Sequence, residues 1–155
     1  MTEKNDSEVS HILQTYGDML YRTAWLLLGN PHDVQDALQE VLLRYLEKAP
    51  AFASREHEKA WLLRVTANCC KDSLRARRRH SHADLEPLRE CLPARESRHL
   101  QELYALPAKW KTVLILHYFE GYSVKEIAGI LGLTENAVKK RLQRARDALR
   151  LELES

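Results

Sequence analysis

The residues with the clearest chemical potential lie near the C-terminal end of the sequence, on one face of a predicted helix. At 100° per residue, four polar side chains share that face: Asn136, Lys139, Lys140 and Gln143. Asparagine and glutamine amides can pair with an adenine edge, and lysine can reach a guanine or a phosphate. Three arginines lie toward the flanks, where phosphate contacts are more natural: Arg141, Arg144 and Arg146. These residue types at this spacing predict a helix that binds DNA in the major groove.

The elements that must position this face form a predicted helix-turn-helix. Ser123 and Glu126 stand at capping-box spacing, so we expect a short helix to begin there. Gly132 permits a left-handed turn, and Thr134 caps a last helix over residues 135–152. The buried face of that helix carries Val138, Leu142, Ala145 and Leu149. A solvated amphipathic helix is the alternative, and the coincidence of caps, glycine and basic face argues against it.

A second basic stripe lies on the helix predicted from about His57 to Arg79. Five residues fall on one side of it, opposite Leu62 and Cys69: Arg64, Asn68, Lys71, Arg75 and Arg78. With a rise of 1.5 Å per residue the stripe is about 20 Å long, which suits a phosphate backbone. Trp61 flanks it and could stack on an unpaired base, although a packed core position is the favoured interpretation.

The helix predicted after the Asn30 cap and Pro31 has the opposite chemistry. Asp36, Gln39, Glu40 and Leu43 lie on one side, away from the apolar stripe that includes Val41. An acidic and amide face with an exposed leucine indicates a protein partner, and a solvated face is the alternative.

The net charge of +2 over 155 residues hides this division. Residues 61–80 hold six basic residues and one acidic residue, and residues 139–155 hold six and three. Residues 1–60, with six basic and ten acidic residues, are acidic.

The helical period and the irregular segment 81–97 predict an all-α fold of two small domains, 1–80 and 98–155, joined by a flexible linker. In the second domain, Pro107 opens a helix for which Gly121 is the expected C-cap.

Several classes of function are excluded by what the sequence lacks. It contains no run of 18 apolar residues, so we expect no membrane insertion, and three cysteines predict a reducing, cytoplasmic location. It contains no glycine-rich phosphate loop and no Ser/His/Asp pattern, so we expect neither an enzyme nor a cofactor. His80, His82, Cys91 and His99 match no familiar zinc spacing, and we expect no metal.

Three stretches, in this order and spacing, resemble the extracytoplasmic-function (ECF) group of bacterial sigma factors in the sigma-70 family. The stretch from Asp36 to Leu43 (DALQEVLL) resembles the helix of that family that binds core RNA polymerase. The stretch from Lys59 to Arg75 (KAWLLRVTANCCKDSLR) resembles its promoter-melting, minus-ten helix. Residues 121–142 (GYSVKEIAGILGLTENAVKKRL) resemble its minus-thirty-five motif.

The resemblance implies a role for each surface. Asp36, Gln39, Glu40 and Leu43 would bind the clamp helices of the polymerase's largest subunit. The minus-ten region would be held by Trp61, Arg64, Asn68, Lys71, Arg75 and Arg78. The minus-thirty-five element would be read by Thr134, Asn136, Lys139, Lys140, Arg141, Gln143 and Arg144. The loop at 51–58 would capture a flipped base, although it departs from the family's pattern. An anti-sigma factor is a further implied partner.

Two other classes of function fit parts of the pattern. The first is a conventional helix-turn-helix regulator whose helical N-terminal domain senses a ligand or dimerises. The second is an interaction module, such as an antagonist that mimics these parts without affinity for DNA. The exposed leucine on an acidic face favours the sigma factor over the regulator, because a sensor domain needs a pocket instead.

Overall fold

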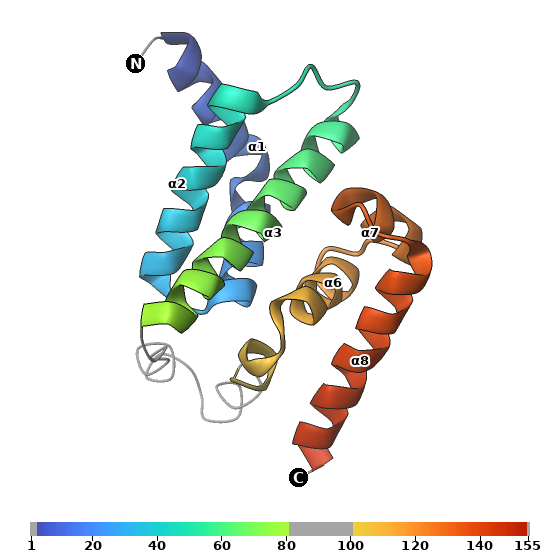
Figure 1. Ribbon diagram of the computed structural model, residues 1–155. Coiled ribbons are helices and arrows are strands. Elements are labelled where there is room, and N and C mark those ends of the chain that lie inside the picture. The colour runs from blue at the N-terminus through green and yellow to red at the C-terminus, as the bar shows by residue number, and fades with distance from the viewer. Residues whose placement is uncertain (1–2, 81–100, 155) are drawn as a thin grey trace.

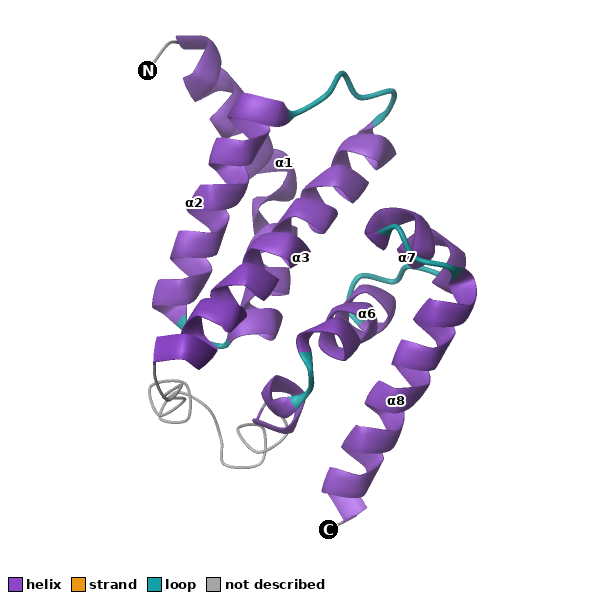
Figure 2. Ribbon diagram, viewed as in Figure 1, coloured by secondary structure: helices purple, strands orange, loops and turns teal. Residues whose placement is uncertain are grey.

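The computed structural model describes residues 3–80 and 101–154, with side chains over 5–76 and 101–150. Six long helices are labelled in Figure 1: α1 (Glu3–Leu28), α2 (Pro31–Lys48), α3 (Arg55–His80), α6 (Ala108–Tyr118), α7 (Val124–Leu131) and α8 (Glu135–Glu154). Residues 101–105 are also helical, and no strand occurs within the described ranges (Figure 2). The all-α prediction is therefore confirmed. In the same ranges, no helix combines the length and the apolar character that crossing a membrane requires.

The first unit packs α1, α2 and α3 against one another. The turn between α1 and α2 uses the predicted signals: Gly29 has φ +67°, and the Asn30 side chain accepts hydrogen bonds from the His32 and Asp33 amides. Pro31 then occupies the first helical position, where a missing N–H costs nothing. Helix α3 begins two residues before the predicted start, because the Ser54 Oγ atom accepts from the His57 amide and caps it there.

The second unit holds the predicted helix-turn-helix. Ser123 and Glu126 form both hydrogen bonds of a capping box, and Gly132 ends α7 in the left-handed conformation. The Thr134 Oγ1 atom accepts from the Ala137 amide, 3.1 Å away, at the start of α8. The expected C-cap of α6 was wrong. The helix ends at Tyr118 with Phe119 as its cap, and Gly121, at φ +76°, belongs to the following turn.

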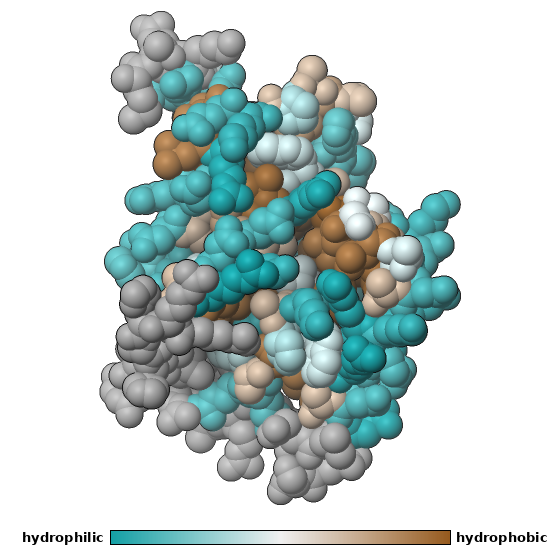
Figure 3. All heavy atoms as spheres, viewed as in Figure 1, coloured by the Kyte–Doolittle hydropathy of each residue, from teal (hydrophilic) through white to brown (hydrophobic). Residues whose placement is uncertain are grey.

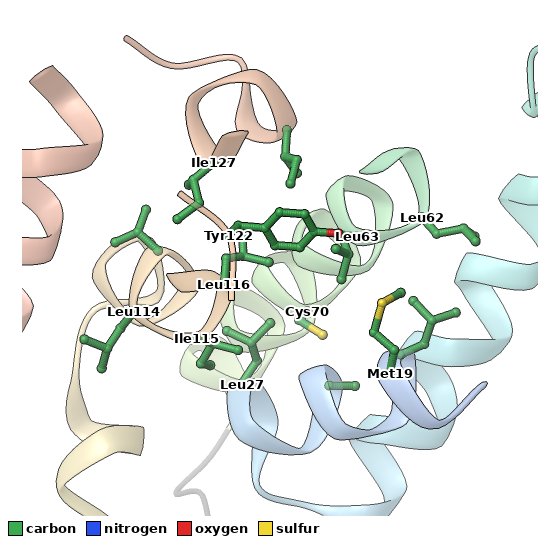
Figure 4. Packing of buried hydrophobic residues seen from close by; sticks show 14 of the residues in the cluster. Met19, Leu27, Leu62, Leu63, Cys70, Leu114, Ile115, Leu116, Tyr122 and Ile127 are labelled. Atoms are coloured by element: carbon green, nitrogen blue, oxygen red, sulfur yellow. The ribbon is translucent and has the colours of Figure 1, made fainter. Parts of the chain in front are cut away.

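The two units share one hydrophobic core. It runs from Ile12 and Val41 through Leu63 and Cys70 to Ile115 and Ile127. Figure 4 shows Leu63 and Cys70 of α3 beside Leu27 of α1, with Leu116 and Tyr122 of the second unit close to them. Cys69 and Cys70 are buried thiols, and burial raises the pKa of Cys70 to about 12.

Polar contacts also join the two units. The Lys111 ammonium, 2% exposed, donates to the Leu27 carbonyl at 2.8 Å, beside the C-terminal end of α1. The Tyr104 hydroxyl donates to the Trp25 carbonyl at 2.9 Å. The predicted linker at 81–97 lies outside the described residues. The direct packing of the units was not predicted from the sequence.

Candidate functional site

The exposed face of α8 carries the residues predicted to read bases. Asn136, Lys139, Lys140 and Gln143 are all exposed, while Val138, Leu142 and Ala145 are buried. Gln143 donates to the Asp147 carboxylate, 2.9 Å away on the next turn. Of the other predicted contacts, Thr134 and Arg144 are exposed and Arg141 is half-buried. The helix therefore presents a set of donors and acceptors on the side opposite the core, as a recognition helix requires.

The basic face of α3 is also at the surface. Arg64, Asn68, Lys71 and Arg75 are exposed, and the Arg78 side chain lies outside the described residues. Trp61 at the edge of this face is half-buried, and its ring meets those of Tyr45 and Phe52 at centroid distances of 5.9 and 5.8 Å. These contacts support the packed interpretation of Trp61.

Of the predicted loop at 51–58, only residues 51–54 form a loop, since 55–58 are the first turn of α3. This segment is held by the aromatic cluster and by a buried carboxylate. Phe52 stacks on Tyr45 and meets the His57 ring at 5.2 Å. The His57 Nδ1 atom accepts from the Ala53 amide at 3.1 Å, so the loop closes on the first turn of α3. The loop is thus a packed segment that holds its shape beside the basic face.

Sequence reasoning missed Glu58, a buried carboxylate at the end of the segment that is predicted to capture a base. Its carboxylate, on a residue only 8% exposed, accepts from the Tyr16 hydroxyl at 2.9 Å and the Tyr45 hydroxyl at 2.7 Å. His11 Nε2 lies 3.1 Å from the same group. Burial raises the pKa of Glu58, but these hydrogen bonds outweigh it and hold the pKa below its usual range. The available signal was its position four residues before Leu62, on the apolar side of α3.

The exposed face of α2 borders an apolar groove. Asp36, Gln39 and Glu40 are exposed, and Leu43 has an exposed fraction of 52%. The groove, of about 550 Å³, lies between α1 and α2. It is lined by Asp6, Val9 and Ser10 of α1 and by Gln39, Leu42, Leu43 and Leu46 of α2. Figure 3 shows apolar surface over this end of the first unit, near the N-terminus. A groove of this kind, bordered by acidic and amide groups, can accept a partner's side chains.

The structure brings the two predicted DNA surfaces together. Asn68 and Lys71 of α3 line a small cleft with Arg141 of α8. An Arg64 guanidinium nitrogen lies 3.7 Å from the position that a Cβ atom would take at Gly132. The sequence places these residues more than 60 positions apart and carries no signal for their contact.

These features define a helical DNA-binding protein with a helix-turn-helix in its second unit. Two family descriptions match the chain: "Sigma-70 region 2" over residues 12–80 and "Sigma-70, region 4" over residues 100–149. The chain is 27% identical to "ECF RNA polymerase sigma factor SigW" of Bacillus subtilis, over 97% of this chain and 92% of the relative. It is 30% identical to "RNA polymerase sigma factor SigV" of the same organism, over 86% and 83%. The chain belongs to the sigma-70 family, in its ECF group.

Solved structures agree with this assignment. CnrH, described in complex with the cytosolic domain of CnrY, is 25% identical, with a TM-score of 0.72 over 94% of this chain and 86% of that one. RpoE of Bartonella quintana, described in complex with the anti-sigma factor NepR, has the same fold, with a TM-score of 0.71 and 22% identity over 95% and 97%. The chain is thus a sigma factor, which binds RNA polymerase core, directs it to promoters and assists their melting. The comparisons favour this function over a conventional helix-turn-helix regulator.

Proposed function

We propose that three separate surfaces of this sigma factor divide the work of initiation. The α2 face binds the clamp helices of the polymerase's largest subunit, with Leu43 entering an apolar site and Asp36, Gln39 and Glu40 supplying polar contacts at its rim. The groove beside Leu43 is the observation that carries this proposal, because an apolar hollow with a polar border fits a protein partner.

The other two surfaces bind promoter DNA. The basic face of α3 holds the minus-ten region, with Arg64, Asn68, Lys71, Arg75 and Arg78 as its contacts. The segment at 51–58 receives an unstacked base. It is held by the hydrogen bond that Glu58 accepts from Tyr45, and Trp61 supports it through contact with the Phe52 ring. The exposed face of α8 reads the minus-thirty-five element, with Asn136, Lys139, Lys140 and Gln143 toward the bases and Thr134, Arg141 and Arg144 toward phosphates.

Binding both promoter elements requires the two units to separate. Elements named for positions 10 and 35 are 25 positions apart, which is roughly 85 Å of duplex at 3.4 Å per base pair. In the packed arrangement, Asn68 of one surface and Arg141 of the other line the same cleft. The packed arrangement is therefore a resting form of the free protein, and the promoter complex is an open one.

The same proposal includes a cytoplasmic location. It also includes an anti-sigma factor that binds the packed form. The support is the likeness to CnrH and RpoE, each of which is described in a complex with a protein partner.

The polymerase-binding role is tested with purified core enzyme. Replacing Asp36 and Gln39 together with alanine should abolish core binding and promoter-directed transcription, with the helical circular dichroism unchanged. The matched control replaces Gln14 and Asp18 of α1, another exposed amide and acid pair, and should bind core as the wild type does. Unchanged core binding by the α2 variant would remove this face from the interface.

A further inference from the structure

A polar cleft of about 170 Å³ lies where the two units meet. Helix α3 contributes Asn68 and Lys71 to its lining, α6 contributes Lys109 and Thr112, and α8 contributes Arg141. Figure 1 shows α6 lying between α3 and α8, so the cleft draws residues from both units. Among the residues that the structure describes, no acidic one is part of its lining.

The described lining of this cleft carries three cations: Lys71, Lys109 and Arg141. Within the part of the chain that the structure describes, no ion pair involves Lys71, Lys109 or Arg141. Elsewhere where the units meet, charge is neutralised: Arg22 binds Glu120 through two hydrogen bonds of 3.0 and 2.9 Å. Closure of the two units therefore gathers positive charge in this cleft, and no carboxylate of the described residues pairs with it.

The first turn of α6 adds to this potential. Ala108 and Lys109 are its first two residues, and Pro107 at the N-cap makes no side-chain capping hydrogen bond. The Thr112 hydroxyl donates to the Ala108 carbonyl at 2.8 Å, so it holds the turn in place. The backbone amides at a helix N-terminus carry partial positive charge and favour an anion beside them.

We propose that this cleft binds a compact phosphate-type anion of about the size of a diphosphate group. A cavity needs only about 10–15 Å³ on this measure to hold one water, so a cleft of about 170 Å³ has room for such a group. Lys71, Lys109 and Arg141 supply charge-assisted hydrogen bonds, and the Asn68 amide supplies a neutral one.

Binding at this place stabilises the packed form of the protein. The anion contacts residues of both units, and separation of the units divides its site. A ligand that binds one of two conformations shifts the population toward that conformation in proportion to its concentration over its Kd. The anion would also compete with promoter DNA for Asn68, Lys71 and Arg141. That competition rests on the proposed function, whereas the anion site itself does not.

The anion site is tested by titrating inorganic diphosphate into the full chain by calorimetry, in a low-chloride buffer without divalent metal. The wild type should bind with a stoichiometry of one, and Lys109→Ala should bind about tenfold more weakly, as the loss of a charge-assisted hydrogen bond predicts. Lys125→Ala, which removes an exposed lysine of α7 outside the cleft, should bind like the wild type. Equal loss in the two variants, or no binding by the wild type at millimolar diphosphate, would overturn the proposal.

Two further measurements complete the test. Diphosphate should slow amide hydrogen exchange in α3 and α6 of the wild type, and unchanged exchange at saturating diphosphate would contradict the stabilisation. Titrations with ADP and ATP distinguish the source of the anion: equal affinities for ADP and diphosphate indicate a phosphate site alone, and tighter ADP or ATP binding, lost in Lys109→Ala, indicates a nucleotide. Lys109 is outside the proposed DNA contacts, so Lys109→Ala should keep the wild-type affinity for promoter DNA without diphosphate. A failure of DNA binding is therefore separate from a failure of the anion site.

Discussion

The buried carboxylate of Glu58 holds the surface segment beside the basic face of α3 in place, although the carboxylate itself is not at that surface. Moving a carboxylate out of water costs several kcal/mol unless hydrogen bonds replace the lost hydration. Tyr16 of α1 and Tyr45 of α2 supply two of them, so the carboxylate joins three helices at the start of α3. Glu58 lies in the first turn of α3, directly after the loop at 51–54, and the same Tyr16 hydroxyl lies 3.4 Å from the Arg55 carbonyl at the start of that turn.

Replacing Glu58 with glutamine should destabilise the fold in a pH-dependent way. Glutamine has the same size, but its NH₂ group cannot accept from a tyrosine, and an unmet buried hydroxyl costs about 1–3 kcal/mol. The folded pKa of Glu58 lies below that of an ordinary glutamate, so its stabilisation is full above the unfolded pKa of about 4.3 and is lost as the pH falls through the folded pKa. Urea unfolding at pH 7 and pH 3 measures this, and the difference between wild type and variant should shrink at pH 3.

The control for this experiment is Glu56→Gln, which changes an exposed carboxylate two residues away. It should have little effect at either pH, because surface substitutions away from buried features usually change stability by less than about 0.5 kcal/mol. A constant difference between Glu58→Gln and the wild type across this pH range would show that the ionised form is not what stabilises the fold.

At the scale of the helices, the sequence predicted most of what the structure contains. Asn30, Ser123 and Thr134 each cap the helix that they were expected to cap, because a side-chain oxygen beside free amides is a strictly local feature. Gly121 was misplaced, since a glycine with positive φ serves a C-cap and a following turn equally well. The buried and exposed sides of α8 followed the wheel, because its apolar residues keep the helical period.

The role of α8 in reading bases is tested by Lys140→Ala. If Lys140 contacts a base, binding to a duplex selected by the wild-type protein should weaken by about 1–3 kcal/mol, with relaxed preference at one position. Fluorescence anisotropy at fixed salt measures this against duplexes changed one base pair at a time. Lys48→Ala, at the exposed end of α2, is the control. An equal loss on every duplex would instead identify Lys140 as a phosphate contact.

At the scale of the whole molecule, the packing of the two units was beyond sequence reasoning. The residues that form the shared core, such as Leu27 and Ile115, follow the same helical period as residues that pack within one unit. Lysine is a residue type usually found at the surface, and only the structure shows the Lys111 ammonium against the end of α1. Contacts between distant segments depend on relative placement, and no local pattern encodes that.

Glu120 offers a way to weaken this packing without changing its shape. Its carboxylate, 4% exposed, accepts two hydrogen bonds from Arg22, and the Thr23 hydroxyl lies 3.3 Å from one of its oxygens. Glu120→Gln should make the packing of the two units less favourable in free energy by about 1–3 kcal/mol, because hydrogen bonds to a charged group are lost. Hydrogen exchange should then be faster in α1 and α6 than in the wild type. A double-mutant cycle with Arg22→Gln should show coupling, and additive effects would contradict the pairing.

A pair of glycines separates backbone strain from contact between the units. Gly29 and Gly121 have φ values of +67° and +76°, so alanine at either position should cost roughly 1–2 kcal/mol of left-handed strain. Only at Gly29 would the new Cβ atom meet the second unit, since it would lie 2.7 Å from the Tyr104 ring. At Gly121, apart from the adjoining residues, no atom of the described chain lies within 4 Å of that position.

Gly29→Ala should therefore be less stable than Gly121→Ala, and it should also favour separation of the units. Displacing Tyr104 would break the hydrogen bond from its hydroxyl to Trp25 and loosen the packing around Lys111. Small-angle scattering should show a larger radius of gyration for Gly29→Ala alone, and core binding should be retained because the α2 face is unchanged. If both variants unfold at the same urea concentration and keep the wild-type radius of gyration, the Tyr104 ring moves aside without a loss of stability. Its contact with the turn after α1 then does not hold the units together.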